Sequence, residues 1–117
     1  MVNDCIFCRI TAGAAPAKII YENERVVVFH DHRPQATTHL LVVPKRHYAT
    51  LLETPAEEVE YLFKVCRALA ERLQVEEGFR LVINNGSRAG QIVFHVHVHF
   101  MSWIKAVGLG KIELAGL

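Results

Sequence analysis

The chain has little cysteine, little net charge and no long apolar run. Its 117 residues include three cysteines, an odd number that argues against a disulfide framework. The 13 lysines and arginines nearly balance the 12 aspartates and glutamates, so the net charge of +1 does not indicate nucleic-acid or membrane binding. No apolar stretch reaches the length needed to cross a bilayer. We therefore expect neither nucleic acid nor a membrane as a partner.

The N-terminus also lacks the features of an export signal. Met1 to Asp4 contains no basic residue, and no apolar segment of signal-peptide length follows it. We therefore expect a cytoplasmic protein. The length and the 51% of hydrophobic residues suit a single domain over residues 1–117 with one core. We expect the folded core at about 5–101 and a tail at 102–117, whose structure the sequence does not predict.

Histidine, by contrast, is plentiful, and three of the seven histidines alternate with apolar residues in one stretch. A strand directs successive side chains to opposite faces, so His95, His97 and His99 are expected to share one face. The other face carries Phe94, Val96, Val98 and Phe100, which we expect in the core. Solvated strand faces seldom consist of histidine. The row therefore indicates a metal site, a catalytic site, or both.

The rest of the pattern predicts an α+β fold with a five-stranded, mostly antiparallel sheet and one long helix. Apolar runs predict strands at 18–22, 25–31, 39–43 and 79–84, with the histidine stretch as the fifth. The helix, of about 20 residues by its apolar periodicity, is expected to start with Thr54 as N-cap, followed by Pro55. Its apolar stripe comprises Val59, Leu62, Phe63, Cys66, Leu69, Ala70 and Leu73. Cys66 is accordingly expected to be a core thiol without a chemical role.

Cys5 and Cys8 form a Cys-x-x-Cys pair, which is typical of half a zinc site or of a thiol redox pair. A redox pair usually follows a strand, and only four residues precede this one. Zinc in structural sites takes four tetrahedral sulfur or nitrogen ligands. His47 and His95 are the candidates for the other two. Two small buried thiols without a ligand remain the alternative.

The same histidine stretch suits phosphoryl or nucleotidyl transfer, because a neutral imidazole is both a good nucleophile at phosphorus and a workable leaving group. His97, at the centre of the row, is the candidate nucleophile. His99 can donate to phosphate oxygens or near the leaving group. His39 could supply a further donor, or could be a buried, hydrogen-bonded histidine that supports the sheet. The loop 84–90 could offer backbone N–H groups to an anion, although most such loops are only turns.

Asp31 closes the second predicted strand and is the candidate for gripping ribose hydroxyls. A turn-capping aspartate before Arg33-Pro34 is an equally good interpretation of the same residue. His30 is expected to have no role and to be exposed.

Taken together, these residues resemble the histidine-triad (HIT) superfamily, in particular its HINT-like nucleoside phosphoramidase branch. The resemblance rests on Gly90-Gln91 followed by His95-Val96-His97-Val98-His99. It is supported by three further segments: Pro16 to Glu22, Phe29-His30-Asp31 and Pro34 to Lys45.

The resemblance implies a homodimer, in which two five-stranded sheets join into one of ten strands, and a purine nucleotide such as AMP or GMP as ligand. It implies hydrolysis of AMP derivatives, typically adenosine phosphoramidates, through a nucleotidyl intermediate on His97. Asp31 would hold the ribose, and the phosphate and sugar would be lined by Asn84, Gly90, Gln91 and His99. The base would be surrounded by Ile6, Phe7, Ile10, Phe29, His32 and Leu41. Structural zinc would be held by Cys5, Cys8, His47 and His95.

Two departures from the family pattern stand out. Relatives usually carry Ser or Thr at the position of Ile92, where a hydroxyl contacts the phosphate, and the tail after Met101 also differs. The first departure motivates an alternative, a nucleotide-binding module with little turnover. A third hypothesis is a metalloenzyme in which His95, His97 and His99 together hold an open zinc site.

Overall fold

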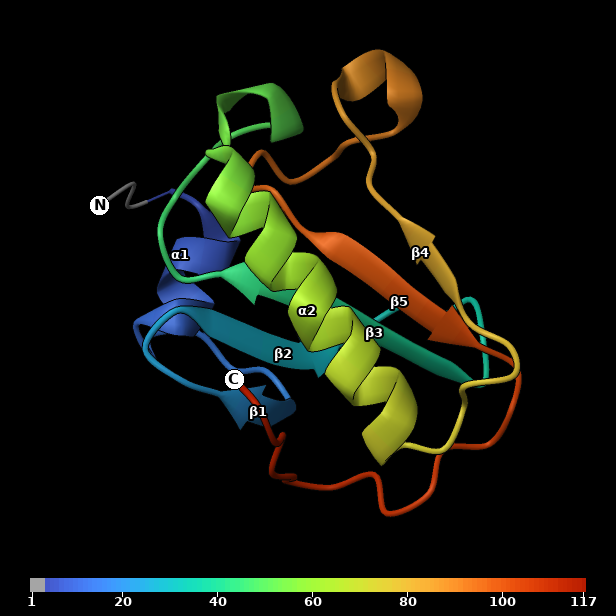
Figure 1. The fold of residues 1–117 in the computed structure, drawn as a ribbon. Coiled ribbons are helices and arrows are strands. Elements are labelled where there is room, and N and C mark those ends of the chain that lie inside the picture. The colour runs from blue at the N-terminus through green and yellow to red at the C-terminus, as the bar shows by residue number, and fades with distance from the viewer. Residues whose placement is uncertain (1–3) are drawn as a thin grey trace.

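The computed structural model describes residues 4–117; residues 1–3, part of the segment tested above for an export signal, lie outside it. The elements are α1 (Ile6–Thr11), β1 (Ile19–Glu22), β2 (Val26–His30), β3 (Thr38–Pro44), η1 (Leu51–Glu53), α2 (Ala56–Arg72), β4 (Arg80–Val82), η2 (Ser87–Ala89) and β5 (Val98–Ser102). The strands form one antiparallel sheet in the order β1-β2-β3-β5-β4. Helix α2 crosses one face of it (Figure 1). The predicted α+β fold is confirmed.

Alternating side chains give the sheet two different faces. Toward α2 the central strands present Val26, Val28, Leu40, Val42, Val98 and Phe100, all buried in the main core. The opposite face presents Val27, Phe29, Leu41 and Val43, which α1 covers with Phe7 and Ile10. His39 and His99 alternate with residues of the main core, and His99 pairs with Leu41 across the ladder. These two histidines therefore lie on the α1 side, away from α2.

Helix α2 differs from its prediction at its start and on one flank. It begins at Ala56 with Pro55 as N-cap, and Thr54 instead donates its hydroxyl to Thr50 O at 2.8 Å. Thr54 was expected to be the N-cap, but the short helix η1 ends there and takes the residue into its own turn. Phe63 is 36% exposed, whereas Tyr61 and Val65 are buried. The buried stripe is therefore rotated slightly from the predicted one.

The histidine strand is shorter than predicted. Strand β5 starts at Val98, so His95 and His97 precede the ladder, and Phe94, expected in the core, is 43% exposed. The β3–β5 pairing ends at Val42 and Val98; continued in the same register it would bring Pro44 opposite Val96. Proline has no N–H to offer a ladder. The chain departs from the sheet at this point, and Pro44 O is available for a side chain.

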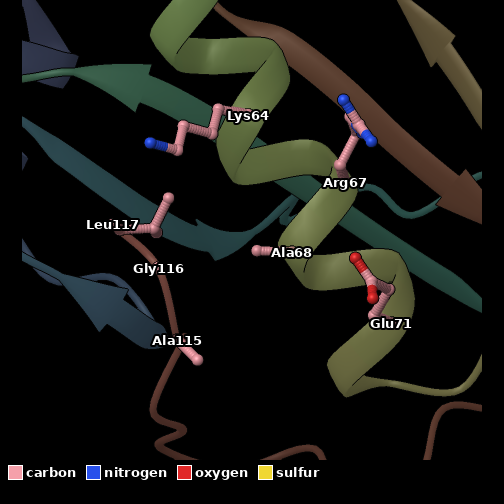
Figure 2. Close-up of a pocket in the computed structure, with 7 residues that line it drawn as sticks. All are labelled: Lys64, Arg67, Ala68, Glu71, Ala115, Gly116 and Leu117. Atoms are coloured by element: carbon pink, nitrogen blue, oxygen red, sulfur yellow. The ribbon is translucent and has the colours of Figure 1, made fainter.

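The C-terminal tail forms neither a helix nor a strand and runs past the end of α2 toward β1 (Figure 1). Ile112 donates its N–H to Ile20 O at 2.8 Å, and Arg72 holds the tail through Val107 O and Gly108 O. A cavity of about 260 Å³ lies between α2 and residues 115–117 (Figure 2); it contains none of the predicted site residues. No helix within residues 4–117 is long and apolar enough to span a membrane.

Candidate functional site

The four predicted zinc ligands converge. Cys5 Sγ lies 3.4 Å and Cys8 Sγ 3.5 Å from His95 Nδ1. Cys8 Sγ lies 3.3 Å from His47 Nδ1, and the two Nδ1 atoms are 3.2 Å apart. Ligands held roughly 2.0–2.3 Å from a tetrahedral zinc ion are themselves separated by roughly 3.3–3.8 Å. The separations and the two-sulfur, two-nitrogen donor set fit a closed zinc site.

The orientation of His95 is fixed from its other ring nitrogen. His95 Nε2 donates to Pro44 O at 2.7 Å, so the lone pair of the neutral ring is on Nδ1, which faces the sulfurs. Burial lowers the pKa of this fully buried imidazole to about 4. A neutral ring that is oriented by a backbone carbonyl is the arrangement that a metal ligand requires. The orientation of His95 therefore fits the zinc-ligand role that the resemblance implies for it.

Helix α1, which the sequence did not predict, presents the two thiols on one side. Cys5 is its N-cap and its sulfur accepts the N–H of Cys8 at 3.3 Å. Residues three apart on a helix are neighbours on its surface. Between them Phe7 points into the sheet, where its ring meets that of His97 edge-on at 5.1 Å and that of Phe29 at 5.4 Å. One short helix therefore contacts both the metal cluster and the candidate nucleophile.

His97 has one ring nitrogen committed and one left for chemistry. Its Nδ1 donates to His95 O at 2.8 Å, which assigns the lone pair of the neutral ring to Nε2. Burial lowers the pKa of His97, since a buried cation is poorly solvated. The residue retains 8% of its surface exposed. These features are those of a neutral imidazole nucleophile.

His39 and His99 form a directed hydrogen-bond chain. The Gln35 N–H donates to His39 Nδ1 at 3.0 Å, so His39 carries its proton on Nε2 and donates it to His99 Nδ1 at 2.9 Å. His99 must then carry its own proton on Nε2. Burial lowers the pKa of His99 to about 4 and also lowers that of His39, with Asp31 opposing both shifts. The chain presents one oriented N–H donor from a partly exposed ring.

Asp31 caps a turn and also lies beside the histidine pair, whereas its expected ribose contact stays a prediction. Its Oδ1 accepts the N–H of Arg33 at 2.8 Å, which is the turn-capping role. Its Oδ2 lies 3.5 Å from His39 Nε2 and 3.9 Å from His99 Nδ1. The carboxylate is therefore held rigidly beside the histidine pair, with its side chain 14% exposed.

The loop before the histidines is held by its own hydrogen bonds. Asn84 donates to Ala89 O, and Gly90 adopts a φ of +90°, which favours glycine. The buried Gln91 amide accepts the N–H of Gly86 and donates to Ala49 O and Val93 O. The suggested nest is corrected in part, because the N–H groups of Gly86, Ala89, Gly90 and Gln91 are bonded within the loop. Gln91 therefore fixes the loop's shape with its side chain.

The predicted base-binding residues fall into two groups. Phe7, Ile10, Phe29 and Leu41 form one apolar cluster on the α1 side of the sheet. Ile6 is 37% exposed, and His32 lies exposed in the loop after β2. His30, expected to be exposed, is only half-exposed at the end of β2, where burial lowers its pKa.

Sequence reasoning missed two backbone groups of the site, because no side chain marks them. The Gln35 N–H sets the tautomer of His39, and Pro44 O orients His95.

The hypothesis of an open zinc site made by His95, His97 and His99 is excluded within residues 4–117. The donor atoms there gather in two sets, Cys5-Cys8-His47-His95 and Asp31-His39-His99, and His97 belongs to neither.

Comparison with known proteins agrees with this geometry. The HIT domain family model matches residues 12–105. Adenylylsulfatase HINT3 of Arabidopsis thaliana is 36% identical over 102 residues, 85% of this chain and 52% of that protein. A HIT family hydrolase from Legionella pneumophila Philadelphia 1 superposes with a TM-score of 0.76 at 36% identity, covering 90% of this chain and 97% of the other. A Zn-bound histidine triad family protein from Mycobacterium smegmatis gives 0.81 at 38% identity, covering 92% and 80%. The chain belongs to the HIT domain family, and its relatives include hydrolases.

Proposed function

We propose that this protein hydrolyses purine nucleoside phosphoramidates or related AMP derivatives at the α-phosphorus through a nucleotidyl intermediate on His97. The observation that carries the proposal is the hydrogen bond from His97 Nδ1 to His95 O, which leaves Nε2 as the nucleophilic atom. The name adenylylsulfatase, carried by a relative, describes a reaction at the same kind of AMP phosphorus.

The first chemical step joins His97 Nε2 to the α-phosphorus as the bond to the leaving group breaks. The oriented His99 Nε2–H donates to a phosphoryl oxygen or to the leaving group, where negative charge accumulates. Water then attacks the nucleotidyl-histidine and regenerates the neutral ring. Because burial already favours the neutral form of His97, the reaction needs no prior deprotonation at pH 7.

Binding of the nucleotide is assigned to the α1 side of the sheet. The base would be surrounded by Ile6, Phe7, Ile10, Phe29, His32 and Leu41, and Asp31 would accept hydrogen bonds from ribose hydroxyls. Asn84, Gly90 and Gln91 would border the phosphate and sugar, Gln91 through the loop shape that its amide fixes. Cys5, Cys8, His47 and His95 would hold zinc; the ion, when bound, cross-links α1 to the segments carrying His47 and His95.

A single-turnover assay with adenosine 5′-phosphoramidate tests the reaction. We expect release of AMP and, after acid-free quenching, a protein mass increased by one adenylyl group on the peptide containing His97. No adduct and no AMP release would contradict the enzyme and favour the alternative, a nucleotide-binding module. That alternative is motivated by Ile92, which is 89% exposed and has no hydroxyl to donate.

The homodimer and the cytoplasmic location remain predictions. Strand β4 ends the described sheet on the side opposite β1, as a ten-stranded sheet across two copies would require. Light scattering at micromolar concentration should give twice the 13.2 kDa chain mass. A mass of one chain would contradict the dimer.

A further inference from the structure

We propose that Cys5 and Cys8 are a peroxide-reactive pair, and that their oxidation to a disulfide abolishes metal binding and weakens nucleotide binding. The sequence allowed a zinc site or a redox pair as alternatives; the geometry supports both as two states of one site. The chemical step stands on the cysteine geometry alone, whereas its effect on nucleotide binding rests on the proposed function.

The two sulfurs are placed for bond formation without unfolding α1. They belong to a group of donor atoms that all lie within 4.8 Å of one another. Cys5, the N-cap, and Cys8, three residues later, have the spacing that brings side chains together on one side of a helix. Cys5 is partly exposed, whereas Cys8 is buried. A peroxide would therefore meet Cys5 first, and Cys8 would act second.

The reaction balances with a peroxide as the oxidant. The Cys5 thiolate attacks one peroxide oxygen, the O–O bond breaks, and a sulfenic acid forms with release of hydroxide or water. The Cys8 thiolate then attacks the sulfenic sulfur, the S–S bond forms, and the hydroxyl leaves as water. Two electrons pass from the two sulfurs to one hydrogen peroxide, which takes up two protons and yields two waters.

Loss of both sulfurs leaves His47 and His95 as the remaining donors of the cluster. Two imidazoles do not complete the four-ligand set that a structural zinc site needs. α1 is then no longer cross-linked to these two histidines. Because Phe7 lies against both His97 and Phe29, movement of α1 alters the wall beside the nucleophile and the apolar cluster below it. Oxidation of the two cysteines should therefore weaken nucleotide binding.

The third cysteine provides an internal control. Cys66 has no exposed surface, and burial raises its pKa to about 12, so it holds little thiolate at neutral pH. It lies on α2, across the sheet from α1. Peroxide should oxidise the Cys5–Cys8 pair and leave Cys66 as a free thiol.

The experiment treats zinc-loaded full-length protein with stoichiometric hydrogen peroxide. We expect loss of two thiols, release of one zinc per chain, a mass decrease of two hydrogens on the Cys5–Cys8 peptide, and an at least tenfold weaker AMP affinity by calorimetry. Dithiothreitol with added zinc should restore all four readouts. Retention of the metal and of all three thiols, or a disulfide that includes Cys66, would overturn the proposal.

Two variants separate the steps. In Cys66→Ala, oxidation and zinc release should be unchanged. In His97→Ala, which cannot form a nucleotidyl intermediate, AMP affinity should still fall at least tenfold on oxidation, so the test does not depend on turnover. If AMP binds equally well to reduced and oxidised protein while the disulfide forms, the coupling through α1 is wrong.

Discussion

Two clusters of histidine-containing donors lie on the same side of the sheet, and they are built in opposite ways. In the cluster of Cys5, Cys8, His47 and His95, lone pairs converge on one point, since His95 has its only ring proton on the far side, at Pro44 O. In the cluster of Asp31, His39 and His99, each ring nitrogen that accepts a proton is matched by one that donates: the Gln35 N–H donates to His39, and His39 donates to His99. Converging lone pairs suit a cation, whereas a proton-filled chain suits an anion.

His97 belongs to neither cluster and is positioned by both. Its Nδ1 donates to the carbonyl of His95, which belongs to the cysteine cluster and whose ring is oriented by Pro44 O. Its ring centroid lies 5.0 Å from that of His99 in the other cluster. The proposed nucleophile thus lies between the proposed zinc site and the proposed anion donor. Substitutions of His97, in the Asp31-His39-His99 cluster and in the cysteine cluster should therefore change different properties. The expected loss of activity is largest at His97 and smaller in the two clusters.

The largest effect is expected from His97→Ala. Removal of the nucleophile should lower hydrolysis of an adenosine phosphoramidate by at least about a thousandfold, while AMP affinity measured by calorimetry stays within a few-fold of wild type. His30→Ala is the matched control, because His30 ends strand β2, two strands away from β5, and has no assigned role. Unchanged turnover in the His97 variant would refute the mechanism.

His99→Ala tests the anion donor. This change removes the N–H that the His39 chain orients, and loss of one preorganised donor typically costs about a hundredfold in kcat. KM should change less, because the donor acts most strongly where charge develops. His39→Gln, which retains a side-chain N–H near His99, should be affected less than His39→Ala. Equal losses in both His39 variants would argue that His39 only supports the sheet.

The parts of the site that depend on local sequence pattern could be predicted. Period-two patterning placed His99 on the strand face opposite Val98 and Phe100, and the spacing of Cys5 and Cys8 indicated half of a zinc site or a redox pair. His95 lies in the cysteine cluster and His97 outside it, although both precede the strand; the different roles expected for them stay predictions. The reason for the shorter strand, the missing N–H of Pro44, acts across the sheet and depends on register, which the pattern alone does not determine.

Other features depend on contacts that are distant in sequence. Helix α1 has only six residues, too few for a periodic signal, and isolated helices of that length are marginal. The tautomers of His39 and His95 are set by backbone groups of Gln35 and Pro44, which carry no side-chain information. The sequence suggested Gln91 as a residue lining the nucleotide pocket, but its side-chain amide forms hydrogen bonds with three backbone groups. Such hydrogen bonds become visible only once the chain is folded.

Cys8→Ser tests the cation cluster. We expect loss of zinc from the purified protein, measured by plasma emission spectrometry, because one of four ligands is weakened. An ion at a thousand times its dissociation constant stabilises a fold by about 4 kcal/mol, or roughly 15 °C in thermal midpoint for a domain of this size. A chelator should lower the wild-type midpoint to that of the variant and leave the variant unchanged. Cys66→Ala, which removes a thiol outside the cluster, should retain the metal; retention by Cys8→Ser would contradict the site.

The smallest expected effect is on the pH dependence of folding stability, which tests the hydrogen-bond chain of His39 and His99. Burial lowers the pKa of folded His99 to about 4 from an ordinary value of 6.5, so between these values the unfolded chain binds more protons than the folded one. The stability that the neutral ring contributes is complete above about pH 6.5, and it is lost as pH falls toward and through 4. Urea midpoints of wild type and His99→Asn, measured from pH 7.5 to 4.5, should therefore converge as pH falls. A constant difference between the two proteins would show that protonation of His99 is not linked to folding, and the proton-filled chain would lose its support.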